Sequence, residues 1–307
     1  MSTFDNNIHD QDIIDIGELA RALASHKWFI SIFIIFSAIA SVAFSLSLPN
    51  EYKSDIHLAP VADDSASSLA GLASQFGGLA SMAGINLPSG GDDKSLLALE
   101  TLKSRKFLTQ FIDNNTLIED ILAADGWDRE ANQVTFDSDL YTDGKWVRSP
   151  PKNRGVIPTS LEAYETFIDD HLRVSVDDDT GFYRISVIHY SPYWAKEILE
   201  KLIFTLEETI KQSDIEEADK SILYINERLE FTNNVDMRNV FYKLLEKQYQ
   251  MKMLGSVKSE YVFKVIDPPF VAEDKESPSR AIICIVGVIL GTFLAVLISL
   301  VRYFWKK

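Results

Sequence analysis

The sequence contains one cysteine and no recognisable catalytic or metal-binding motif. Because Cys284 lies in an apolar run, the polar part of the chain has no disulfide, thiol nucleophile or thiolate metal site. The five histidines are scattered, and none has the His-Glu-x-x-His spacing of a zinc enzyme. There is no Gly-x-Ser-x-Gly elbow and no Walker-type loop. We therefore predict that the protein is not an enzyme and holds neither a metal nor a cofactor.

Two long runs without a charge lie near the ends of the chain. Trp28 to Leu48 and Ala281 to Val301 each contain 21 residues, about the length that crosses 30 Å of hydrocarbon. A buried helix of a soluble protein is the alternative for the second run. A cleaved signal peptide is the alternative for the first, but 27 residues with five acids precede it, unlike the short basic region of a signal peptide. The sequence predicts a protein that spans a membrane twice.

Basic residues near the spans favour a cytoplasmic location for both tails. The tails carry Arg21, Lys27, Arg302, Lys306 and Lys307, whereas Arg280 is the one dissenting charge on the far side. The predicted organisation is a cytoplasmic tail at 1–27, a span at 28–48, an extracytoplasmic domain at 49–280, a span at 281–301 and a cytoplasmic tail at 302–307.

The loop between the spans is strongly acidic. The chain has 45 acids and 30 bases, and because the tails hold five of each, the loop holds 40 and 25. Such a surface repels nucleic acid and anionic headgroups, so nucleic acid is not a predicted partner. Three consecutive aspartates, Asp177 to Asp179, lack EF-hand spacing and precede Thr180-Gly181, which favours a hairpin turn over a calcium site.

Hydrophobic periodicity predicts a mixture of helices and strands in the loop. The expected elements are a strand at 51–58, a helix at 95–114, a short helix at 117–124, a helix capped by Thr159 or Ser160, a hairpin of strands 172–176 and 182–188, helices at 192–231 and 236–254, and a strand at 261–266. The Ala-, Gly- and Ser-rich segment at 63–94 is predicted to be weakly helical or a loop, and 126–158 to be irregular.

The longest predicted helix, 192–231, has a narrow apolar stripe. Forty residues at about 1.5 Å each reach about 60 Å, longer than a small domain is wide. We therefore predict that the stripe packs against neighbouring subunits. Its predicted interface residues are Leu199, Leu202, Leu206, Ile210, Ile222 and Leu229. The alternative is a hairpin of helices packed within a monomer.

Small residues mark one face of the second span. Gly287, Gly291 and Ala295 are spaced four apart, a pattern that lets helices approach closely. The first span and a neighbouring subunit are both possible partners for this face.

The whole layout resembles the polysaccharide co-polymerases, the Wzz-type chain-length determinants of Gram-negative inner membranes. The resemblance is carried by "DIGELARALASHKWFI" before the first span, by "SLEAYETFIDDHLRVSVDDDTGFYRISVIHYSPYWAKEILEKLI" and by "FKVIDPPFVAEDKESPSRAIICIVGVILG". The proline-rich approach of that family aligns with Pro268 and Pro278, whereas Ala272 and Lys275 stand where further prolines are common and Ala295 where a third glycine often lies.

The resemblance implies an α+β membrane protein in which two transmembrane helices flank a periplasmic domain with an α/β base and a long protruding helical hairpin. It implies a non-enzymatic homo-oligomer, a ring such as an octamer, that acts with the O-antigen polymerase on a lipid-linked polysaccharide and sets its length. Pro268, Pro278, Gly287 and Gly291 are then expected to serve the membrane portion. Because no kinase domain follows the second span, the chain resembles the class linked to O-antigen. Exopolysaccharide, capsule and enterobacterial common antigen remain alternative polymers.

Overall fold

The computed structural model describes residues 27–61 and 90–305, which fall into two compact units. Residues 27–50 and 276–305 form a membrane unit, and residues 51–61 and 90–275 form a loop domain. Most of the Ala-, Gly- and Ser-rich segment predicted at 63–94, and nearly all of the N-terminal tail, lie outside the described residues.

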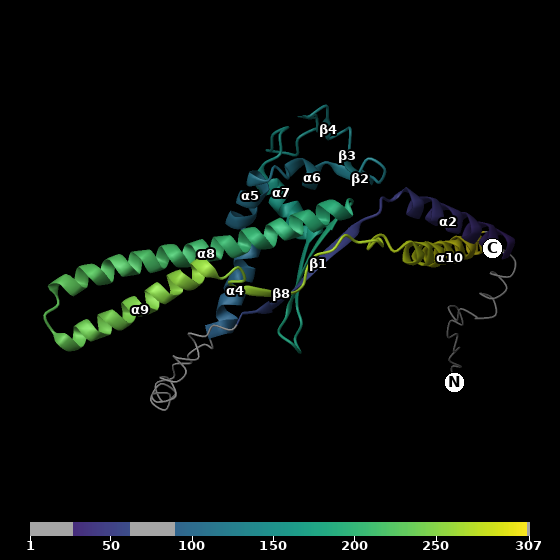
Figure 1. Cartoon of the computed structure of the whole chain (residues 1–307). Helices are drawn as coiled ribbons and strands as arrows, with labels where there is room; N and C mark the ends of the chain where they lie inside the picture. The colour runs from purple at the N-terminus through teal and green to yellow at the C-terminus, as the bar shows by residue number, and fades with distance from the viewer. Residues whose placement is uncertain (1–26, 62–89, 306–307) are drawn as a thin grey trace, which may run out of the picture. The chain divides into compact units, whose positions relative to one another are not determined.

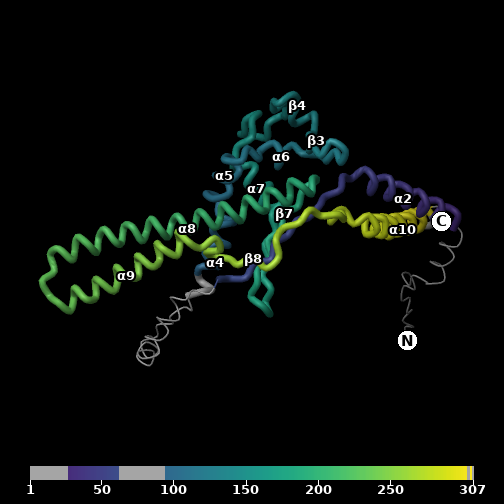
Figure 2. The backbone as a smooth tube through the Cα atoms, viewed as in Figure 1, coloured from purple at the N-terminus to yellow at the C-terminus, as the bar shows by residue number. Residues whose placement is uncertain are grey.

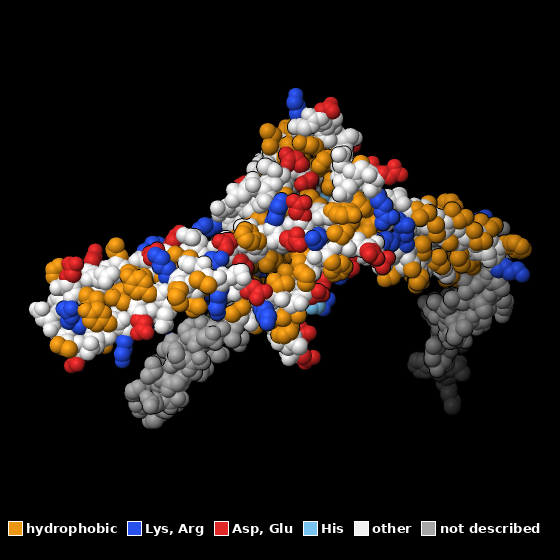
Figure 3. Space-filling model, viewed as in Figure 1, with side chains coloured by type: hydrophobic (Ala, Val, Ile, Leu, Met, Phe, Trp, Pro, Cys, Tyr) orange, Lys and Arg blue, Asp and Glu red, His pale blue; other side chains and the backbone are white. Residues whose placement is uncertain are grey.

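The membrane unit consists of two helices that lie side by side (Figure 1). Helix α2 spans Lys27–Ser47 and helix α10 spans Arg280–Trp305. Both are long and apolar enough to cross a membrane. Hydrophobic side chains cover most of the visible surface of this pair in the space-filling view (Figure 3). The prediction of two candidate membrane helices near the two ends of the chain is confirmed.

A four-stranded antiparallel sheet forms the base of the loop domain. Its order is β6-β7-β1-β8, with β1 at Tyr52–Pro60, β6 at Leu172–Val176, β7 at Tyr183–His189 and β8 at Phe263–Asp267. Along β1, buried side chains alternate with half-buried ones, as expected for a sheet with one covered face. Ile56 of β1 pairs with Ile185 of β7, and both are buried in the core. Gly181, at φ +69°, supplies the left-handed residue of the β6–β7 turn.

Helix α8, at Pro192–Phe231, contacts β1 and β7 with its first half and helix α9, at Val235–Val257, with its second (Figure 2). Ser191 caps the start of α8, since its hydroxyl accepts from the Trp194 amide at 3.3 Å. Asn234 caps α9 in the same way through the amides of Asp236 and Met237. The predicted hairpin of long helices is therefore present.

Shorter helices complete the base. They are α4 at Gly90–Lys103, α5 at Arg105–Asn114, α6 at Ile118–Leu122 and α7 at Ser160–Thr166, which continues into a π-helix at Phe167–His171. The predicted single helix at 95–114 is wrong, because Ser104 is extended and caps α5 through the Phe107 amide. Of the two predicted caps of α7, Thr159 is the cap and forms a complete capping box with Glu162, whereas Ser160 is the first residue of the helix.

Two further predictions need correction. Residues 126–158 are not wholly irregular, since β2 at Ala124–Asp128 pairs with β3 at Gln133–Phe136, and β4 at Tyr141–Thr142 pairs with β5 at Lys145–Trp146. Aromatic side chains in these hairpins carry little period-two signal. Helix α9 does not end at Gly255 but passes through it, because the missing side chain lets Ile215 of α8 pack against the backbone.

Candidate assembly surface and membrane helix pair

The apolar stripe predicted as an interface between subunits is buried within its own chain. Leu199, Leu202 and Leu206 are fully buried and Ile210 is 7% exposed, all in the core beneath the sheet. Leu229 is buried and Ile222 half-buried against α9. Five of the six predicted interface residues are therefore covered within the chain, and Ile222 remains half-buried.

A different apolar surface of the hairpin is exposed. On α9, Leu245 points at α8, and successive helical residues advance by about 100°. Val240 and Leu244, 50% and 41% exposed, therefore lie on one side of the contact with α8. On the other side lie four residues that are 51–70% exposed: Val235, Tyr242, Tyr249 and Met253. We call these two surfaces the first flank (Val240, Leu244) and the second flank (Val235, Tyr242, Tyr249, Met253).

The two flanks face in different directions, so one hairpin can contact two neighbours. Val235, Tyr242 and Tyr249 are spaced seven apart, the repeat by which helices of different chains pack side by side. Hydrophobic side chains are visible among charged ones along the hairpin (Figure 3). A surface that is apolar on two flanks is suited to repeated head-to-tail contacts, which close into a ring when the rotation allows.

The two helices of the hairpin carry charges of opposite sign. Residues 215–231 of α8 include five acids and two bases, a net of −3, and residues 235–257 of α9 include four bases and two acids, a net of +2. The ion pair between Lys252 and Asp219, 2.6 Å from Nζ to Oδ1, joins them within the chain. Most of the remaining charged residues of the two helices are exposed.

A buried carboxylate ties the hairpin to the sheet. Glu207 of α8 accepts hydrogen bonds from the backbone amides of Tyr261, Val262 and Phe263 at 3.0, 3.0 and 2.8 Å. Burial raises the pKa of Glu207, and the three amides act in the opposite direction. The chain that returns from α9 is thus fixed to α8 where β8 begins. Glu207 was not predicted, because a glutamate on a charge-rich helix looks like any solvated residue.

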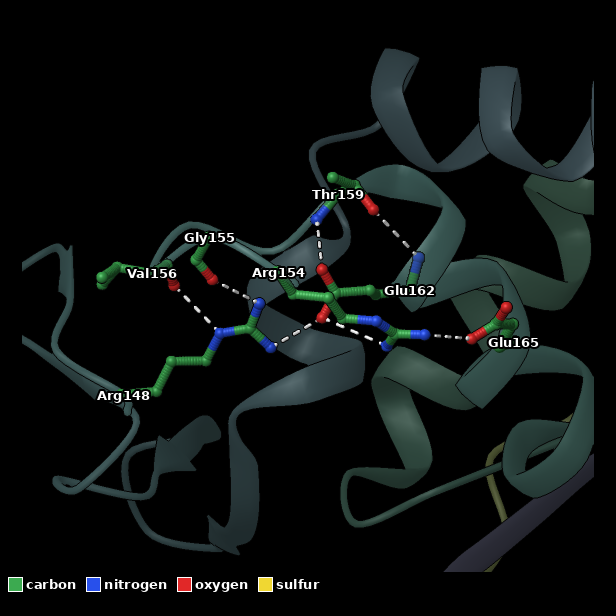
Figure 4. Close-up of polar contacts among 7 residues, drawn as sticks. All are labelled: Arg148, Arg154, Gly155, Val156, Thr159, Glu162 and Glu165. Carbon is green, nitrogen blue, oxygen red and sulfur yellow. Dashed lines mark hydrogen bonds and ion pairs between the residues drawn. The ribbon is translucent and has the colours of Figure 1, made fainter. Parts of the chain in front are cut away.

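A second buried carboxylate holds the segment that precedes α7 (Figure 4). Glu162 is 6% exposed, and its Oε2 lies 2.8 Å from Arg148 Nη1 and 3.4 Å from Arg154 Nη1. Arg148 also donates to the carbonyls of Gly155 and Val156. Burial acts to raise the pKa of Glu162, but Arg148, the Thr159 amide and Arg154 together hold it below its usual range. The cluster fastens residues 148–156 to the base.

Histidine and tryptophan side chains form a buried junction at the start of α8. His189 stacks on Trp194 at 4.0 Å between ring centroids, its Nδ1 accepts from the Ser191 amide, and its Nε2 lies 3.1 Å from the Asp120 carbonyl oxygen. Burial lowers the pKa of His189 to about 3, with His171 acting in the same direction. His189 is therefore neutral, and these contacts are structural. In the described part of the chain, no group of three His, Cys, Asp or Glu could hold a metal.

Gly287 and Gly291 lie against the first span. A Cβ at either glycine would collide with Ser41 or Ser37 of α2. The Ser37 hydroxyl donates to the Gly287 carbonyl at 2.9 Å, and the Ser41 hydroxyl to the Ile283 carbonyl at 3.0 Å. The small-residue face thus pairs the two membrane helices of one chain.

The two prolines do not join this contact. Pro268 lines a hollow of about 400 Å³ between α8 and the edge strand β8 of the loop domain. Pro278 belongs to the membrane unit, two residues before α10, and follows a cis peptide bond.

Comparison with known proteins bears on the first third of the chain. Residues 12–115 match the family described as Wzz, chain length determinant protein. These 104 residues, about a third of the chain, are similar to the Wzz family. They include the first candidate membrane helix, β1, α4 and α5. The resemblance predicted from the sequence is confirmed over these residues, which match a family described as chain length determinants.

A solved structure described as a full-length bacterial polysaccharide co-polymerase is also similar. It is 14% identical, the match covers 96% of this chain and 98% of that one, and the TM-score is 0.40. No curated protein matches the sequence.

Proposed function

We propose that the protein is an inner-membrane co-polymerase that sets the chain length of lipopolysaccharide O-antigen. The observation that carries the proposal is the Wzz family match over residues 12–115 in a chain with two candidate membrane helices. In this proposal residues 49–280 form the periplasmic domain, 28–48 and 281–301 span the membrane, and both tails are cytoplasmic. The protein performs no catalysis of its own and acts with the O-antigen polymerase on the lipid-linked polysaccharide.

Ring assembly is part of the proposal, with contacts different from those predicted from the sequence. The exposed apolar flanks of α9 support head-to-tail contact between hairpins of adjacent subunits. The stripe from Leu199 to Leu229 instead stabilises each subunit from within.

A gel of lipopolysaccharide tests the function. A strain that lacks the gene is compared with its parent and with a complemented strain. We expect a cluster of O-antigen lengths in the parent to become a short, unregulated ladder in the mutant and to return on complementation. An unchanged ladder contradicts the O-antigen assignment, and a changed size of exopolysaccharide, capsule or enterobacterial common antigen in the same strains identifies the other polymer.

A further inference from the structure

The two membrane helices leave a groove of about 480 Å³ between the ends that lead to the loop domain. Ser37, Ser41 and Gly287 line it where the helices approach each other, and the larger side chains of Phe44, Ile282 and Leu290 also contribute to it. Its volume is within the range of about 300–1,000 Å³ that is typical of small-molecule sites. The groove arises because small residues bring the helix backbones together while their large neighbours project on either side.

The groove is suited to hydrocarbon. The only polar side chains that line it are Ser37 and Ser41, and both hydroxyls already donate to carbonyls of α10. No donor is therefore left to attract water or a polar ligand, and an apolar chain replaces nothing that needs a hydrogen bond.

A cation lies next to the same end of the groove. Arg280 is the first residue of α10 and precedes Ile282 of the groove by two positions, about 3 Å along the helix axis. Its Nη2 donates to Asn50 Oδ1 at 3.1 Å, whereas its Nε is buried without a hydrogen-bond partner among the described residues. Arg280 as a whole is only half-buried, and the fork of its guanidinium matches the oxygens of a phosphate.

We infer that this groove binds one anionic phospholipid, with an acyl chain between α2 and α10 and the phosphate at Arg280. The occupant has to be apolar over most of its length and negative at one end, which a phosphate-headed lipid in the adjoining leaflet fulfils. The acidic surface of the loop repels anionic headgroups in general, so binding of an anionic lipid needs a local cation, which Arg280 supplies. The inference does not depend on the proposed function.

Native mass spectrometry of the full-length protein in detergent tests the inference. The protein is titrated with phosphatidylglycerol and, separately, with phosphatidylcholine, which has the same chains but no net charge. We expect one phosphatidylglycerol per chain to be retained about tenfold more strongly than phosphatidylcholine. Arg280→Gln should remove this preference, whereas the control Arg302→Gln, at the other end of α10, should preserve it.

A second variant tests the groove itself. Ala40 lines the groove and is exposed, so Ala40→Leu fills the space without touching the contact of Gly287 with Ser41. It should weaken retention of both lipids by a similar factor. Equal retention of the two lipids by the wild type overturns the inference, as does an equal loss in the Arg280 and Arg302 variants. Lipid retention is measured on the purified protein and polysaccharide length in cells. Failure of the lipid inference can therefore be told apart from failure of the proposed function.

Discussion

Glu162 joins three parts of the base: the start of α7, Arg148 and Arg154. Glu162→Gln leaves Arg148, whose side chain is 11% exposed, without its carboxylate. We expect the free energy of unfolding to fall by about 3 kcal/mol, because a buried charge loses its partner. Chemical denaturation of the full-length protein in detergent, followed by circular dichroism, measures it.

The matched control is Glu165→Gln. Glu165 is 51% exposed and pairs with Arg154, so this change should cost about 0.5 kcal/mol or less. Equal losses in the two variants would show that burial does not matter here.

His189 makes the stability of the base depend on pH. Its pKa falls from 6.5 to about 3 on folding, so between these values the unfolded chain binds a proton that the folded chain does not. The stabilisation is complete above pH 6.5 and is lost as the pH falls toward 3. The expected slope is about 1.4 kcal/mol for each pH unit below 6.5.

Unfolding of the wild type and of His189→Gln between pH 7.5 and 5 checks this expectation. The variant should be less stable at pH 7.5, because one amide cannot replace both contacts of the ring, but its stability should change less with pH. Glu162 has a low pKa and affects stability only in more acidic solution. Burial raises the pKa values of Asp120 and Glu207, but both groups are present in the wild type and in the variant, so the comparison of slopes reports on His189. If the free energy of unfolding of the variant depends on pH as steeply as that of the wild type, His189 is not the cause of the dependence.

At the scale of elements, helix α8 shows what the sequence predicts and what it does not. Its length follows from apolar residues three and four apart and from Ser191-Pro192 at its start, and the observed bounds are Pro192–Phe231. The identity of the surface that covers its stripe does not follow, because β1, β7 and α9 meet it from distant parts of the sequence. Arg148 was missed for the same reason, since a segment without periodicity gives no sign of where an arginine points.

The corrected role of the stripe gives a prediction at this scale. Leu202 is fully buried, so Leu202→Ala should lower the free energy of unfolding by about 2–5 kcal/mol through a cavity. Leu223→Ala, on the same helix at 65% exposure, should cost about 0.5 kcal/mol or less. Denaturation of both variants measures the difference. If the Leu202 variant is as stable as the wild type but fails to assemble, the stripe contacts neighbouring subunits after all.

At the scale of the whole molecule, assembly through two different flanks has a consequence that a symmetric contact lacks. In a head-to-tail ring, the first flank of one subunit meets the second flank of the next, so loss of either flank prevents closure. Val240→Glu with Leu244→Glu removes the first flank, and Tyr242→Glu with Tyr249→Glu removes the second. Each double variant alone should be monomeric in light scattering of the detergent-solubilised full-length protein. Gln250→Glu, an exposed residue of α9 outside both flanks, is the matched control and should assemble like the wild type.

Mixing the two double variants separates the alternatives. The variant without the first flank retains the second flank, and the other variant retains the first. A mixture can therefore form one contact between one copy of each variant and no further contact. We therefore expect dimers that grow no further and a loss of polysaccharide length control in cells that express either variant. If each variant instead forms a dimer with itself, the contact joins like flanks and head-to-tail closure is wrong. If both variants still form large assemblies, the contacts that build the ring lie outside α9.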